Sequence, residues 1–120
     1  MRESISLELG IVSDEISNDF AEAMRHASAW GISLMEIRLL KSGRVPNVTQ
    51  ADFDEVQRYI ADRKVRITAL SPGIFKHSLS KTAELEHEIT DVLPRTIEMA
   101  RSFGCGMIII FGFQREAEEN

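Results

Sequence analysis

The stretch GCGMIIIFG, residues 104–112, decides how the chain folds. Five consecutive apolar residues, Met107 to Phe111, stand between glycines, which favour turns. A short run that is apolar at every position is typical of a strand in a parallel sheet that is covered on both faces. We therefore expect a fully buried strand near residues 106–112, in a sheet whose other strands come earlier in the chain.

A long helical pattern precedes this run. Apolar residues recur three or four positions apart between residues 82 and 103, and Gly104 supplies a stop signal. Pro94 lies inside the pattern and removes one backbone hydrogen-bond donor, so we expect a kink near Asp91 or two abutting helices.

Strands and helices alternate back to the N-terminus. Three earlier apolar runs predict strands near residues 6–12, 33–39 and 65–71. Two capping signals, Asn18 or Asp19 and then Thr49, are each followed by apolar residues at helical spacing and predict a helix after each of the first two strands. The order is βαβαβαβ in one domain over residues 1–120, with a polar tail at 114–120. Because a helix joins each pair of strands, we expect a parallel sheet.

Composition and charge narrow the class of protein. The chain has 120 residues, of which 43% are hydrophobic and 28% charged, as in an ordinary globular domain. Its net charge of -5 argues against a nucleic-acid partner, because binding to phosphates usually needs a basic face. No stretch approaches the ~20 apolar residues of a membrane helix. We expect a cytoplasmic protein without a membrane partner, and a buried, unreactive Cys105.

The sequence favours part of a barrel over a complete open sheet. After the strand near residues 106–112 only the polar tail follows, without a helix to cover that strand. A complete (β/α)8 barrel needs about 250 residues. We therefore expect an α/β fold that forms the N-terminal half of a TIM-type (β/α)8 barrel.

Four segments in a fixed order carry a resemblance to a known family. They are LGIVSDEIS (9–17), AWGISLMEIRLL (29–40), RITALSPGIFK (66–76) and ARSFGCGMIIIFGF (100–113). They resemble the opening half of a sugar phosphate isomerase/epimerase of the xylose isomerase-like barrel superfamily. In that family SDEI-type residues follow the first strand, and a glutamate ends the second.

The resemblance implies part of a metal-dependent isomerase or epimerase that acts on a small sugar or polyol, either free or phosphorylated. In that family the catalytic glutamate pair and the ligands of the divalent metal (Mn, Mg, Zn or Co) come from later strands. The resemblance therefore implies no catalytic or metal-binding residue in this chain, and no metal bound by the chain alone.

The candidate substrate-binding residues follow the strands, because active sites of α/β barrels lie at the carboxyl ends of the strands. Glu36 ends the second strand among apolar neighbours, where a carboxylate needs a partner, which is either the substrate or Arg38. A pairing of Glu36 with Arg38 fits equally well, because residues two apart share a face of a strand. After the first strand, Asp14 and Glu15 either bind sugar hydroxyls or, as we favour, stabilise the start of the next helix.

The loop after the third strand carries three further candidates. Ser71, Lys76 and His77 offer a hydroxyl, a cation and an imidazole, a combination suited to a phosphorylated or acidic sugar. The simpler and favoured interpretation is that Lys76 and His77 are solvated loop residues. The predicted substrate-binding set is then Glu15, Glu36, Arg38, Lys76 and His77.

Other functions stay open. A non-catalytic half-barrel could self-associate as a homodimer, or pair with a complementary half, through the exposed edges of its first and last strands. An apurinic endonuclease of related fold is less favoured, because Glu36, Pro72 and Phe111 stand where those enzymes place metal-binding histidines. A flavodoxin-like domain would need a phosphate loop, which the sequence does not show.

Overall fold

The structure of the chain, a computed structural model, describes residues 6–116. Its strands are β1 (Gly10–Val12), β2 (Leu34–Ile37), β3 (Leu39–Leu40), β4 (Gly43–Arg44) and β5 (Arg66–Leu70). Its helices are the 3-10 turn η1 (Ser13–Glu15), α1 (Phe20–Ala29), α2 (Gln50–Ala61), α3 (Thr82–His87), the π-helical turn η2 (Glu88–Val92) and α4 (Leu93–Phe103).

Three strands form a parallel sheet in the order β1-β2-β5. Gly10 pairs with Leu34, and Leu34 pairs with Arg66. The β2–β5 register shifts between Met35 and Glu36. The predicted α/β class and the parallel direction of the strands are thus confirmed, while the strands are shorter than expected.

Local signals set the helix ends as the sequence predicts. The Asp19 carboxylate accepts a hydrogen bond from the Ala21 N–H at 3.1 Å and begins α1. The Thr49 hydroxyl accepts one from the Asp52 N–H at 3.3 Å and begins α2. Gly104 ends α4 in the left-handed conformation, with φ of 69°, which glycine adopts without steric cost.

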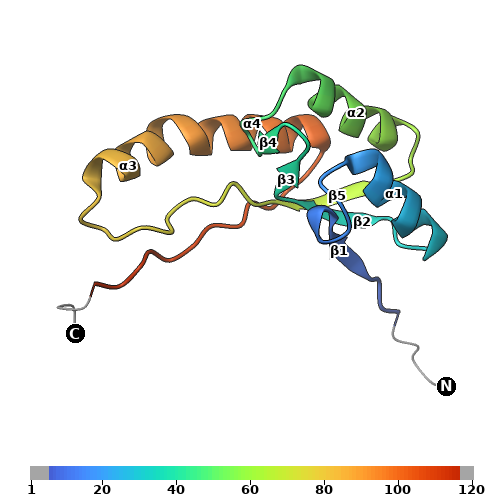
Figure 1. Cartoon of the computed structure of the whole chain (residues 1–120), viewed down its shortest axis with the longest axis horizontal. Helices are drawn as coiled ribbons and strands as arrows, with labels where there is room; N and C mark the ends of the chain where they lie inside the picture. The colour runs from blue at the N-terminus through green and yellow to red at the C-terminus, as the bar shows by residue number, and fades with distance from the viewer. Residues whose placement is uncertain (1–5, 117–120) are drawn as a thin grey trace.

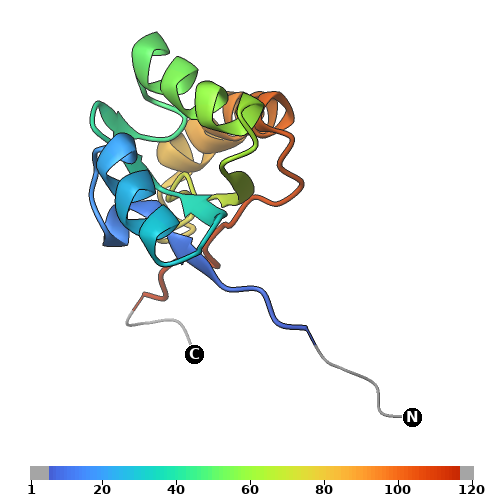
Figure 2. The same cartoon turned by 90° about the vertical axis from the view of Figure 1, so that its right-hand side faces the viewer.

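All the helices that pack on the sheet lie on one of its faces. Figures 1 and 2 show α2 and α4 above the strands, α1 beside them, and no helix of residues 6–116 below them. The buried core lies between these helices and the alternate strand residues Met35, Ile37 and Ile67. We call the side with these residues the covered face, and the side with Glu36 and Thr68 the bare face.

The segment near residues 106–112 differs from the prediction. It pairs with β5 through one parallel bridge, Leu70 to Ile108, and is not a regular strand. The expected full burial is wrong, since Met107, Ile110 and Phe111 are exposed. The physical reason is that β5 bonds one edge of the segment, while no described element covers its other side.

The first strand is also shorter than expected, and the long helical pattern is divided into three elements. Residues 6–9 are outside β1, and Leu7 and Leu9 are 85% and 73% exposed, because no described strand pairs with them. Between α3 and α4, the chain keeps its helical course through η2, and Pro94 falls in the first turn of α4. A proline is tolerated there because the first N–H groups of a helix have no helical acceptor. The two helices α3 and α4 thus abut through a wider π-helical turn, Glu88–Val92, which includes Asp91.

The sequence did not predict the small antiparallel hairpin β3–β4, which follows β2. The loop that follows β5 runs away from the sheet beside the C-terminal segment, toward α3 (Figure 1). Backbone N–H groups of Phe111, Phe113 and Gln114 donate to carbonyls of residues 74, 75 and 77 at 2.7–3.2 Å. We call these two adjoining segments, residues 72–81 and 107–116, the arm.

The molecule is less compact than a typical domain of its length, because the arm extends away from the sheet and one face of the sheet is bare. Its radius of gyration is 16.7 Å, against about 14 Å for a compact domain of this length. Cys105 is buried as expected, and its Sγ donates to the Met107 carbonyl at 3.3 Å. Of the helices in residues 6–116, none has the length and apolar character needed to cross a membrane.

Candidate functional site

The carboxyl ends of β1, β2 and β5 bring several polar side chains to one edge of the sheet. η1 follows β1 and carries Asp14 and Glu15, and Arg38 directly follows β2. Arg44 lies at the end of the β3–β4 hairpin, and Ser71 follows β5. We call this edge the rim; it is where ligands bind in parallel α/β folds.

An ion pair joins the first two strands at the rim. The Arg38 Nε and Nη2 donate to the two carboxylate oxygens of Asp14 at 3.1 and 2.8 Å, and Nη2 also lies 3.2 Å from Glu15 Oε1. The Asp14 side chain is only 6% exposed, whereas that of Arg38 is 34% exposed. This fork fixes the end of β2 against the turn that follows β1.

Charge and burial act in opposite directions on this pair. Burial by itself would raise the pKa of the Asp14 carboxyl, but hydrogen bonds from Arg38, its charge and two backbone N–H groups outweigh burial and lower the pKa. The hydrogen bond to Asp14 in turn raises the pKa of Arg38. Both groups therefore stay charged throughout the neutral range.

Glu36 occupies a different position from the one that the Glu36–Arg38 alternative requires. Arg38 is bound to Asp14 and Glu15, and within residues 6–116 the Glu36 carboxylate has no hydrogen-bond or ion-pair partner, although its charge adds to those of Asp14 and Glu15 in raising the pKa of Arg38. Glu36 lies on the bare face beside a cavity of about 150 Å³, which Val12 and Thr68 also line. A carboxylate in this place can accept hydrogen bonds from hydroxyl groups of a ligand.

The two predicted residues of the loop after β5 lie on the arm. The Lys76 ammonium is exposed and sits 4.7 Å from the centre of the Phe111 ring. The His77 Nε2 lies 2.5 Å from Glu88 Oε1, and its Nδ1 lies 2.8 Å from the Ser78 carbonyl oxygen. These contacts make them constituents of the arm, apart from the rim residues.

The structure adds one rim residue that the sequence analysis missed. Arg44 Nε donates to the Ser71 carbonyl oxygen at 3.1 Å, and Nη2 donates to the Ser71 hydroxyl at 3.3 Å. The sequence shows Arg44 only as a cation in a loop with Gly43 and Pro46. No periodic pattern marks β3–β4, so nothing in the sequence placed this side chain at the end of β5.

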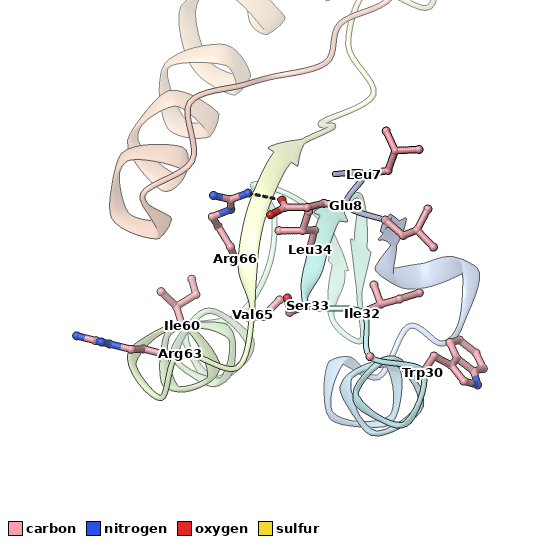
Figure 3. Close-up of a pocket in the computed structure, with 12 residues that line it drawn as sticks. Leu7, Glu8, Trp30, Ile32, Ser33, Leu34, Ile60, Arg63, Val65 and Arg66 are labelled. Carbon is pink, nitrogen blue, oxygen red and sulfur yellow. Dashed lines mark hydrogen bonds and ion pairs between the residues drawn. The ribbon is translucent and has the colours of Figure 1, made fainter. Parts of the chain in front are cut away.

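A larger cavity than the one beside Glu36 lies at the opposite end of the sheet. It has a volume of about 650 Å³ and is formed by the amino ends of β2 and β5 with the exposed side chains of Leu7, Leu9 and Trp30 (Figure 3). Its one ion pair joins Glu8 and Arg66 at 3.2 Å, with both side chains 69% exposed. This cavity is open and lined by polar and apolar surface in about equal parts. Its polar side chains are exposed, whereas the groups that orient a sugar are usually partly buried.

A divalent metal does not fit the described part of the chain. Residues 6–116 contain no group of three Asp, Glu, His or Cys side chains placed to hold a metal ion. Oxygen-rich sites for Mg²⁺ or Mn²⁺ need several converging ligands, and Glu36 has none beside it. That the chain alone binds no metal stays a prediction.

Comparison of the chain with protein-family models, with curated proteins and with solved structures gives no match.

Proposed function

We propose that this chain supplies part of the substrate-binding rim of a (β/α)8-type isomerase or epimerase that acts on a small sugar or polyol. The proposal takes the parallel sheet as the opening half of such a barrel, with the bare face toward the barrel interior. Helices on one face only, and ligand-facing groups at the carboxyl ends of the strands, are what this arrangement requires.

The observation that carries the proposal is the position of Glu36. A partly buried carboxylate at the carboxyl end of the central strand is costly unless it is compensated, and in the described chain Glu36 has only the more distant charge of Arg38 and no hydrogen-bond or ion-pair partner. Asp14 and Arg38 neutralise each other and hold the strand ends, which leaves Glu36 available to sugar hydroxyls. The acid-base groups of the reaction are not assigned to any described residue.

Ligand binding by the 120-residue chain tests the proposal. Neutral pentoses, hexoses and polyols would be titrated while backbone amide signals are followed by NMR. We expect shifts at residues 12–15 and 36–38, with at least tenfold weaker binding in Glu36→Gln. Glu98→Gln, an exposed change on α4, should leave binding unchanged. Shifts confined to the cavity around Trp30, or equal binding by Glu36→Gln, would contradict the proposal.

A second candidate function is self-association as a half-barrel module, and the exposed sheet edges favour it. Leu7 and Leu9 precede β1 on one edge, while Met107, Ile110 and Phe111 lie on the other. Each edge presents apolar side chains beside backbone groups that can pair with another strand. A second copy placed edge to edge would cover the apolar side chains of both edges.

Sedimentation equilibrium tests self-association. We expect a dimer at about 10–100 μM that Leu9→Arg converts to a monomer, because the new charge would be buried between the edges. Leu79→Arg changes a residue that is 56% exposed but lies on the arm, and should leave the dimer intact. A folded wild-type monomer throughout this range would exclude the module.

A further inference from the structure

The guanidinium of Arg44 is held in one place at the rim. Its two contacts with Ser71 tie the β3–β4 hairpin to the carboxyl end of β5, and Ser71 itself is 2% exposed. A guanidinium has five N–H donors, and these contacts use two of them. Nη1 and the second hydrogen of Nη2 have no acceptor within residues 6–116.

A comparison with Arg38 shows what Arg44 lacks. In the described chain these are the two arginines that are partly buried, while the other arginines are exposed. Arg38 is paired with two carboxylates, but Arg44 has no carboxylate within ion-pair distance in the same part of the chain. A partly buried cation that is bound only by neutral oxygens has incomplete compensation for its lost hydration.

Gly73 keeps the backbone beside this guanidinium open. Its φ is +72°, and a Cβ built there would lie 2.6 Å from both Cζ and Nε of Arg44. Only glycine fits without moving Arg44. Ser71 therefore orients the planar guanidinium group from one side, and the missing side chain of Gly73 leaves room for it on the other. Such a fixed guanidinium is suited to binding an oxyanion.

The other cations after β5 are engaged on the arm. Lys76 lies over Phe111, and His77 is bound to Glu88. Neither contact holds these groups at the rim, although the sequence offered both as the residues for a charged sugar.

We infer that Arg44 is the anion-binding residue of the rim and that the substrate carries a phosphate or carboxylate group. This inference rests on the proposed function and narrows the substrate class from sugars in general to anionic ones. The unused Nη1–H and Nη2–H donors bind two oxygens of the anion side by side.

Titration of the 120-residue chain with inorganic phosphate and, separately, with acetate tests the inference. NMR would follow the Arg44 Nε–Hε and Gly73 amide signals. We expect saturable shifts, with the tighter of the two ions identifying the anion class, and at least tenfold weaker binding in Arg44→Gln. Arg44→Lys keeps the charge without the fork and should give intermediate affinity. Arg101→Gln, at an exposed position on α4, should bind like the wild type.

Gly73→Ala provides an independent variant, because the added methyl group displaces the guanidinium while Arg44 stays in the sequence. We expect this variant to lose most of the anion binding, which also covers the case in which Arg44→Gln fails to fold. Absence of saturable binding, binding that survives both changes, or shifts centred on Lys76 and His77 would overturn the inference. Shifts at Glu36 with neutral sugars, but none at Arg44 with either anion, would keep the rim and reject the anion subsite.

Discussion

The two faces of the β1–β2–β5 sheet differ in what covers them. On the covered face, Met35 and Ile37 have no exposed surface and pack under α1, α2 and α4. On the bare face, Leu34 and Glu36 alternate with them along the same strand and are partly exposed, and Thr68 of β5 is exposed. The four residues of β2 thus contribute alternately to the buried core and to an uncovered surface.

The covered face therefore provides stability, while the bare face is available for contacts with a ligand or a partner. Alternation along β2 gives each face its own side chains, so that the covered face is made of apolar atoms and the bare face can hold a carboxylate. Burial of apolar surface accounts for the folding energy on one side. The other side has to be completed by a ligand, by another copy of the chain, or by water.

Adjacent substitutions on β2 give the largest expected effect. Met35→Ala should lower the free energy of unfolding by about 2–5 kcal/mol, because it leaves a cavity in the core. Leu34→Ala should cost about 1 kcal/mol or less, because its side chain keeps partial contact with water. Urea denaturation measures both. Equal costs would mean that the bare face is covered in solution, in agreement with self-association.

The sequence predicted the covered face well for a clear physical reason. Helix caps at Asp19 and Thr49, the stop at Gly104 and the alternating strands depend on residues close together in the chain. The run Met107–Phe111 was misjudged because its burial depends on which element lies beside it. An apolar run shows that burial would be favourable, but it does not show that a covering element exists.

At the rim, the Asp14–Arg38 pair should have the second largest effect. Asp14→Asn removes the two charge-assisted hydrogen bonds from Arg38 and should lower the free energy of unfolding by about 1–2 kcal/mol. This is at the lower end of the range for hydrogen bonds to charged groups, because Arg38 is 34% exposed. Asp62→Asn, an exposed change after α2, is the matched control. Urea denaturation at pH 7 measures the difference in unfolding free energy.

The effect of Asp14 should depend on pH in one direction. Its folded-state pKa is lowered, so the pair contributes fully above the unfolded pKa of about 4 and is lost as pH falls through the folded pKa. The difference between wild type and Asp14→Asn should therefore shrink only below about pH 4. A difference that is the same at pH 7 and pH 3 would show that packing, and not the ion pair, is what the variant loses.

The site was less predictable than the fold because it depends on contacts between distant residues. Glu36 and Arg38 were singled out from their place in an apolar run, but the partner of Arg38 is Asp14, 24 residues earlier. Arg44 and Ser71 are 27 residues apart and meet because the hairpin β3–β4 folds against the end of β5. Residue type and local spacing do not encode such pairs.

The smallest expected effect concerns the pH dependence of His77, which lies on the arm, outside both faces of the sheet. The Ser78 carbonyl and then the Glu88 carboxylate raise the pKa of His77, since both ring nitrogens donate in the protonated form. A raised folded-state pKa means that the contact is strongest below the unfolded value of about 6.5 and is lost as pH rises through the folded pKa.

NMR titration of the ring protons measures this behaviour. We expect the pKa of His77 to fall in Glu88→Gln, and the Gln114 amide, which donates to the His77 carbonyl at 2.8 Å, to lose protection as His77 deprotonates. His77→Gln serves as the reference at each pH, so that the intrinsic change of exchange with pH cancels. If wild type and His77→Gln lose protection in parallel, the arm is held by its backbone pairing and by the Phe75–Phe113 stack, whose ring centres lie 5.0 Å apart, and not by the imidazolium. Parallel behaviour would make the arm as insensitive to pH near neutrality as the covered face of the sheet.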